Sequence, residues 1–149
     1  MFGLILLSLP VLGAELVVGD AVPAITANDQ NGLPYTFTNG TQCLLIAMEM
    51  DSAKAANHKL ANQGAGFLEK HGAVYLMDVH TMPAIARVFA FPKMRKYPQR
   101  IVLVDAPDAL NWVPVKPGQI TVLSLTGAGH VNKISYWDPA KDSVTKMFE

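Results

Sequence analysis

Short apolar runs alternate with helical patterns through the middle of the chain. Residues 44–48, 73–79 and 101–105 are almost entirely apolar, and each run has the length of a strand that is covered on both faces. Between these runs, apolar residues recur at helical spacing over 53–72 and 81–92. This β-α-β-α-β order predicts parallel strands that are joined by right-handed helical crossovers.

Individual residues predict where the two helices begin and end. Asp51 or Ser52 is expected to cap the first helix, and Thr81 the second, by accepting backbone N–H bonds. Gly64 is expected to interrupt the first helix because glycine weakens a helix interior. The pair at 91–92, Phe-Pro, is expected to close the second helix.

Two hairpins are predicted on either side of this core. An Asn-Gly pair at 31–32 lies between short apolar runs at 25–27 and 35–37, and both residues accept the positive φ of a tight turn. Near the C-terminus, 119–137 reads as two strands around a Gly-containing turn. The Asp-Pro pair at 138–139 then predicts the start of a final helix. The whole pattern predicts an α/β fold with a mixed central sheet, an N-terminal β-hairpin and an extra C-terminal β-hairpin.

The N-terminal segment 1–14 is uncharged and apolar and ends in small residues. It is short for a membrane span and resembles the apolar core of a secretory signal, with a break near Gly13 or Ala14. No Lys or Arg precedes it, so an uncleaved anchor and a segment buried in the fold are alternatives. With a signal at 1–14, residues 15–149 form a single domain that is exported to the periplasm or cell envelope of a bacterium.

Composition then narrows the classes of partner and chemistry. The 149 residues contain 12 Lys and Arg and 12 Asp and Glu, so the formal net charge is zero. Binders of nucleic acids or acidic membranes carry a marked basic excess, so neither class is expected here, and membrane contact is expected, if at all, only through an uncleaved signal. The sequence contains no phosphate loop, dinucleotide fingerprint, zinc-protease motif or Gly-x-Ser-x-Gly motif, and no cofactor is expected.

Three local patterns occur in the order found in a known superfamily. Residues 19–23 read Gly-Asp-Ala-Val-Pro and are followed by a polar turn at 29–32. The apolar run 44–48 is followed by Ser52, and 97–105 reads Tyr-Pro-Gln-Arg-Ile-Val-Leu-Val-Asp. This order resembles the thioredoxin-like superfamily, in particular peroxiredoxins and membrane-tethered periplasmic thioredoxin-like reductases. The resemblance implies a three-layer sandwich around the mixed sheet.

The resemblance ends at the residues that carry the superfamily's chemistry. Dithiol exchange needs a low-pKa thiolate at a helix N-terminus and a second thiol that resolves the mixed disulfide. The stretch where the Cys-x-x-Cys motif falls, 49–56, contains no cysteine, and Cys43 is the only cysteine of the chain. Cys43 lies at the opposite end of the first core strand and is expected to be a buried structural residue. The sequence therefore predicts neither a dithiol oxidoreductase nor a peroxidase.

The residues that flank the modified active-site loop are the candidate site for an unidentified protein, peptide or small-molecule partner. These residues are Glu49, Met50, Asp51, Ser52, His80, Tyr97 and Pro98. The resemblance implies a cis peptide bond between Tyr97 and Pro98 at the border of this site. The neighbouring bases of 93–100 would then line a shallow cleft for an anionic ligand.

Two alternatives to a non-redox binding module remain open. The first is an enzyme that uses the modified loop through Ser52, Asp51 or His80, although no His–Asp pair can be assigned to Ser52. The second, less favoured, is a copper-handling protein. Met50, His80 and Met82 follow neighbouring strands whose C-terminal ends meet in an open α/β sheet, and Met and His suit copper(I).

Overall fold

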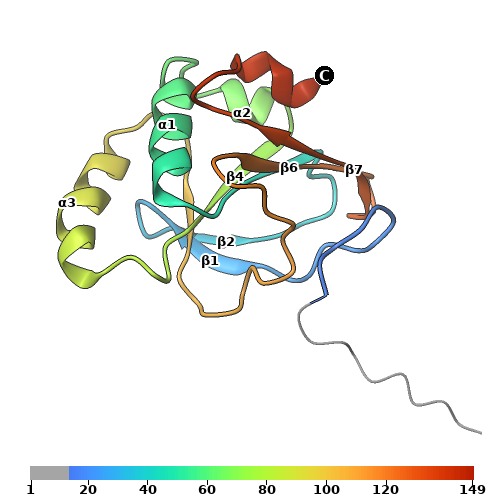
Figure 1. Ribbon diagram of the computed structural model, residues 1–149, viewed down its shortest axis with the longest axis horizontal. Helices are drawn as coiled ribbons and strands as arrows, with labels where there is room; N and C mark the ends of the chain where they lie inside the picture. The colour runs from blue at the N-terminus through green and yellow to red at the C-terminus, as the bar shows by residue number, and fades with distance from the viewer. Residues whose placement is uncertain (1–13) are drawn as a thin grey trace, which may run out of the picture.

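One mixed sheet organises the computed structural model, which describes residues 14–149 (Figure 1). The strands of this part of the chain are β1 (Thr26–Asp29), β2 (Pro34–Thr36), β3 (Cys43–Ala47), β4 (Ala73–Asp78), β5 (Val102–Val104), β6 (Ile120–Leu125) and β7 (Val131–Trp137). Their order across the sheet is β2-β1-β5-β4-β3-β6-β7. β3, β4 and β5 are parallel, as predicted, and the hairpins β1–β2 and β6–β7 extend the sheet on either side of them with antiparallel pairing.

The helices pack together on one face of the sheet. They are α1 (Met50–Ala61), α2 (Phe67–Lys70), α3 (Ala84–Arg95) and the 3-10 helix η1 (Val144–Phe148). Side chains alternate along β3, so Leu45 belongs to the core beneath the helices whereas Leu44 and Ile46 belong to the core on the opposite face. Irregular segments around Leu16 and Trp112 cover that second face. The three layers are therefore helices, sheet and irregular segments.

Glycines interrupt and end the first helical region as predicted. α1 ends at Ala61 and α2 begins at Phe67, and Gly64 between them has φ +88°. Gly72 follows α2 with φ +59°, and a Cβ at this position would lie 2.9 Å from side-chain atoms of Gln42. Only glycine has both this backbone freedom and this clearance.

The predicted helix caps are wrong. The N-cap residues of α1 and α3 are Glu49 and Pro83, and neither makes a side-chain cap hydrogen bond. Asp51 and Ser52 lie inside the first turn because α1 begins earlier than its apolar pattern suggested. Thr81 is separated from α3 by two residues, so its hydroxyl is too early in the chain to cap the helix.

α3 also runs further than predicted, since it passes through Pro92 and ends at Arg95. Proline removes the N–H that would bond to the carbonyl of Val88. Val88 and Pro92 are both exposed, so water can bond to that carbonyl and the helix is not forced to end.

The final helix predicted from Asp138 is replaced by a turn and the later η1. The carboxylate of Asp138 accepts a hydrogen bond from the backbone N–H of Ala140 at 3.0 Å. The backbone carbonyl of Asp138 accepts one from the N–H of Asp142 at 2.8 Å. These bonds form a local turn in place of a helical start. The indole N–H of Trp137 donates to the carbonyl of Ser143 at 3.0 Å and fixes the approach to η1.

Candidate functional site

The loop that replaces the dithiol motif lies where β3 ends and α1 begins. The carboxylate oxygens of Glu49 each lie 3.3 Å from the backbone N–H of Gly118, which donates to them. Gly118 precedes β6, the antiparallel neighbour of β3. Met50 and Asp51 beside Glu49 are exposed. The 114–119 loop, rather than Tyr97-Pro98, is therefore the segment in contact with this corner.

Ser52 does not face solvent at this corner. Ser52 is 5% exposed, and its hydroxyl donates to the backbone carbonyl of Glu49 at 3.1 Å. A nucleophilic serine needs an accessible oxygen and a base within hydrogen-bond reach, whereas this hydroxyl is used inside the first turn of α1. Among residues 14–149, the hydrogen bonds of Ser52 include no histidine or carboxylate partner.

His80 lies at the same edge of the sheet, after β4. Its Nδ1 lies 2.6 Å from Oδ1 of Asp78, and its backbone N–H donates to the same oxygen at 3.0 Å. A small cavity of about 100 Å³ separates His80 from Met48 and Asn111. His80 is thus held by its own strand end and borders a space that is too small for a typical ligand.

The methionines of the copper hypothesis lie in different environments. Met82 is 5% exposed and belongs to the core beneath the helices, whereas Met50 is 43% exposed. In the described part of the chain, no three His, Cys, Asp or Glu side chains form a group that could hold a metal ion.

Tyr97 and Pro98 lie away from the corner, and the prediction of a cis peptide bond between them is wrong: no peptide bond in 14–149 is cis. Tyr97 instead meets His58 edge to face, with ring centroids 6.0 Å apart, more than two turns into α1 from Glu49. The direction of β5 explains why Tyr97 and Pro98 lie away from the corner. The segment 96–101 leads into β5, which is parallel to β4, so it enters at the amino edge of the strands, whereas the corner lies at their carboxyl edge.

Cys43 is the first residue of β3 and lies at that amino edge. It is 5% exposed, and burial raises the pKa of its thiol to about 12. At neutral pH roughly one molecule in 10⁵ would carry the thiolate, the form that attacks disulfides and peroxides. The expectation of a buried structural cysteine is confirmed.

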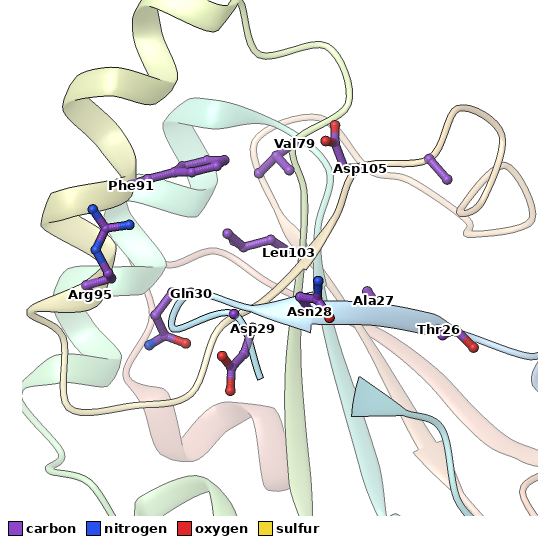
Figure 2. Close-up of a pocket in the computed structure, with 12 residues that line it drawn as sticks. Thr26, Ala27, Asn28, Asp29, Gln30, Val79, Phe91, Arg95, Leu103 and Asp105 are labelled. Carbon is purple, nitrogen blue, oxygen red and sulfur yellow. The ribbon is translucent and has the colours of Figure 1, made fainter. Parts of the chain in front are cut away.

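A cleft of about 450 Å³ lies between β1, β5 and α3, and we call it the α3–β1 cleft (Figure 2). It is lined by Thr26, Ala27, Asn28, Asp29, Gln30, Gly32, Val79, Phe91, Arg95, Leu103, Asp105 and Ala106. Figure 2 shows Phe91 projecting from α3 toward Val79 and Leu103, with Arg95 next to it on the same helix. Its apolar wall and polar rim are typical of a ligand site.

Both carboxylates that line the cleft have a guanidinium partner. Arg87 bonds Asp105 through two nitrogens at 2.7 Å each, and these hydrogen bonds lower the pKa of Asp105. Burial alone would raise the pKa of Asp29, but the hydrogen bond from Arg100 at 2.9 Å and two backbone N–H bonds lower it overall. Arg95 has no ion pair with any residue of 14–149. The cleft therefore presents one guanidinium without a counterion.

The sequence located only part of this cleft. Arg95 belongs to the basic run that was expected to line a cleft, and it lines the α3–β1 cleft. The contribution of β1 was missed, because the pairing of Asn28 with Leu103 in β5 joins segments far apart in the chain. No local pattern in 26–32 indicates that pairing.

Comparison with known proteins supports the fold and not a particular relative. No family model and no curated protein matches the chain. The thioredoxin domain of a thiol-disulfide oxidoreductase from Bacteroides vulgatus aligns with a TM-score of 0.57 and 16% identity, over 91% of this chain and 100% of that one. A peroxiredoxin-like protein from Aquifex aeolicus aligns with a TM-score of 0.57 and 13% identity, over 84% of this chain and 78% of that one. A thio-disulfide isomerase from Thermus thermophilus aligns with a TM-score of 0.52 and 19% identity, over 81% of this chain and 87% of that one.

The fold is thus the thioredoxin-like α/β fold, as the sequence predicted, and the chain carries it with one cysteine and no Cys-x-x-Cys motif. At these identities the likeness extends to the fold alone. Within 14–149, no helix is long and apolar enough to cross a membrane.

Proposed function

We propose that this chain is a non-redox binding module of the bacterial cell envelope, which binds an anionic small molecule or peptide group in the α3–β1 cleft. The observation that carries the proposal is the place of its only thiol. Cys43 is buried at the amino edge of the sheet, whereas thioredoxin-type chemistry requires a thiolate at the start of α1. The fold is retained without that chemistry, and the α3–β1 cleft offers a cavity of about 450 Å³ with an apolar wall and a guanidinium.

The lining of the cleft supports an anionic ligand with an apolar part. Phe91, Val79 and Leu103 provide an apolar wall, and Arg95 lies at one end with no counterion among the described residues. A guanidinium binds a carboxylate through two parallel hydrogen bonds, which favours a planar anion over a neutral group. The cavity volume lies within the usual range for small-ligand sites.

Export to the envelope is the part of the proposal that rests on segment 1–14, of which residues 1–13 lie outside the described residues. Its uncharged apolar run and small residues near Gly13 support a cleaved signal. The test is the intact mass of the protein recovered from separate cell fractions. A mature form that begins near residue 15 in the periplasmic fraction is expected, and a full-length form in the cytosol would contradict export.

The cleft is tested with a matched pair of probes, N-acetyl-phenylalanine and its uncharged amide, in an amide-resolved NMR titration. We expect the carboxylate to bind more tightly and to shift signals from Asn28, Phe91 and Leu103. Arg95→Ala is expected to weaken carboxylate binding roughly tenfold or more, with little effect on the amide, whereas Arg95→Lys retains part of the preference. Equal binding of both probes, or shifts confined to Glu49 and His80, would exclude this cleft.

The non-redox part has its own test. Insulin-disulfide reduction and hydrogen peroxide consumption are expected at the background rate, both for the natural chain and for Cys43→Ala. Catalytic turnover that disappears in Cys43→Ala would contradict the proposal, because it would show that the buried thiol becomes accessible.

A further inference from the structure

α3 presents an apolar stripe to solvent. Ile85, Val88 and Phe89 are 74%, 67% and 68% exposed. With about 100° of rotation per residue, the three side chains fall within an arc of about 100° on the helix. Met94, the only fully buried residue of α3, projects from the opposite side. The stripe is therefore the outer face of this helix.

The stripe is convex and stands outside the cleft. The α3–β1 cleft uses Phe91 and Arg95 and none of the stripe residues. α3 lies at one end of the molecule, at the left of Figure 1, far from the first described residues at the right. Three protruding side chains bury much less than the area of about 800 Å² per partner that a stable protein interface needs. The stripe is therefore better suited to a soft surface, which side chains can enter without a matching groove, than to a protein partner.

The charges near the stripe indicate which kind of surface the stripe would bind. Residues 79–104 contain five of the chain's 12 Lys and Arg and none of its 12 Asp and Glu. Arg87 and Arg100 are paired with carboxylates, and Arg95 lines the cleft. Lys93 and Lys96 are exposed and have no ion pair within 14–149. At about 100° of rotation per residue, Lys96 at the C-cap of α3 falls within the arc of the stripe, and Lys93 lies about 40° beyond the edge of that arc.

We propose that α3 docks in the headgroup region of an anionic phospholipid bilayer. Ile85, Val88 and Phe89 enter the boundary between headgroups and acyl chains, and Lys93 and Lys96 extend to the lipid phosphates. Apolar side chains beside lysines on one helix face are the arrangement by which interfacial helices bind such membranes. The zero net charge of the whole chain conceals this region, because residues 79–104 contain no Asp or Glu and Lys93 and Lys96 have no ion pair within 14–149. The proposal is independent of the cleft and its ligand.

Insertion is tested by placing a tryptophan in the stripe of the full-length chain. Phe89→Trp is compared with Val115→Trp, which adds an exposed tryptophan away from α3, and the natural Trp112 and Trp137 are buried. Vesicles of phosphatidylglycerol and phosphatidylcholine carry bromine on the upper acyl chain as a quencher. We expect quenching of the Phe89→Trp fluorescence well above that of Val115→Trp. Equal quenching in both variants, or none in Phe89→Trp, would overturn the proposal.

The charge requirement is tested with two variants of equal net charge. Lys93→Glu/Lys96→Glu is expected to weaken binding to the anionic vesicles roughly tenfold or more. Lys70→Glu/Lys141→Glu changes two other exposed lysines and is expected to have a much smaller effect. Equal losses would show that total charge, and not α3, governs binding. Binding of the natural chain that is equally tight to pure phosphatidylcholine would also overturn the anionic-lipid assignment, because the apolar segment 1–14 would then explain it.

Discussion

α1 and α3 are helices of equal length that play opposite roles. Each has 12 residues and follows a parallel strand, β3 in one case and β4 in the other. α1 buries Ser52, Ala53, Ala56, Asn57 and Leu60. α3 buries Met94 and exposes Ile85, Val88 and Phe89. An apolar stripe at helical spacing therefore predicts a helix correctly without indicating which face meets the core.

The sheet explains the difference. α1 connects β3 and β4, two strands at the centre of the sheet, and lies above a continuous apolar surface. α3 connects β4 to the short β5 and reaches beyond it toward the β1–β2 hairpin. Its inner face consists of the buried Met94 with the partly buried Ala86, Ala90 and Phe91, and the two alanines touch the core without filling it. Each prediction below tests how far this contrast holds.

The largest effect is expected from Leu60→Ala in α1. Leu60 is 1% exposed, and its removal leaves a cavity beneath the helix. We expect a loss of about 3 kcal/mol in the free energy of unfolding, measured by denaturant titration. A loss below about 1 kcal/mol would mean that α1 is packed as loosely as α3.

Gln99→Ala tests whether the chain after α3 is anchored to α1. Gln99 is 1% exposed, and its Nε2 donates to the carbonyl of Asn57 at 3.1 Å. Losing this bond and the buried volume is expected to cost about 2 kcal/mol in the same titration. Pro98→Ala is the neighbouring control, since Pro98 is exposed and should change stability by less than about 0.5 kcal/mol. Similar losses in both variants would contradict the anchor.

Arg87→Ala should loosen α3 itself, with a smaller effect than Gln99→Ala. Arg87 donates to the carbonyls of Val79 and Met82 and pairs with Asp105. The hydrogen bonds from Arg87 lower the pKa of Asp105 below 3.8. The ion pair therefore stabilises the folded state above about pH 4, and this stabilisation is lost as the pH falls through the lowered pKa. The difference in unfolding midpoint between the natural chain and the variant should shrink from pH 7 to pH 3. An unchanged difference would show that the ion pair contributes nothing.

The smallest effect is expected from Phe89→Ser in the α3 stripe. Its side chain has few contacts to lose, so the free energy of unfolding should change by less than about 0.5 kcal/mol in either direction. A loss above about 1 kcal/mol that grows with protein concentration would mean that a second copy covers the stripe in solution.

The parallel core could be predicted because its information is local. The apolar runs around Leu45, Leu76 and Val102 are strands, and Gly64 interrupts a helix, as expected. The site could be predicted only in part. Glu49 and His80 share the carboxyl edge, but Tyr97 lies at the opposite one. Which neighbour a strand selects depends on pairing between distant segments, and a single sequence with short strands does not encode that choice locally.

The central strand has a consequence for the order in which the fold can form. β3 pairs with β4 on one side, but its other neighbour, β6, is made much later, with Leu45 opposite Val122. β1 likewise cannot form its pairing with β5, in which Asn28 lies opposite Leu103, until β5 has been synthesised. Long-range pairing of this kind makes folding slow, because long loops must close before the contacts form. Until residues 120–137 have been synthesised, a nascent chain cannot complete the sheet, and one side of β3 remains without its partner strand.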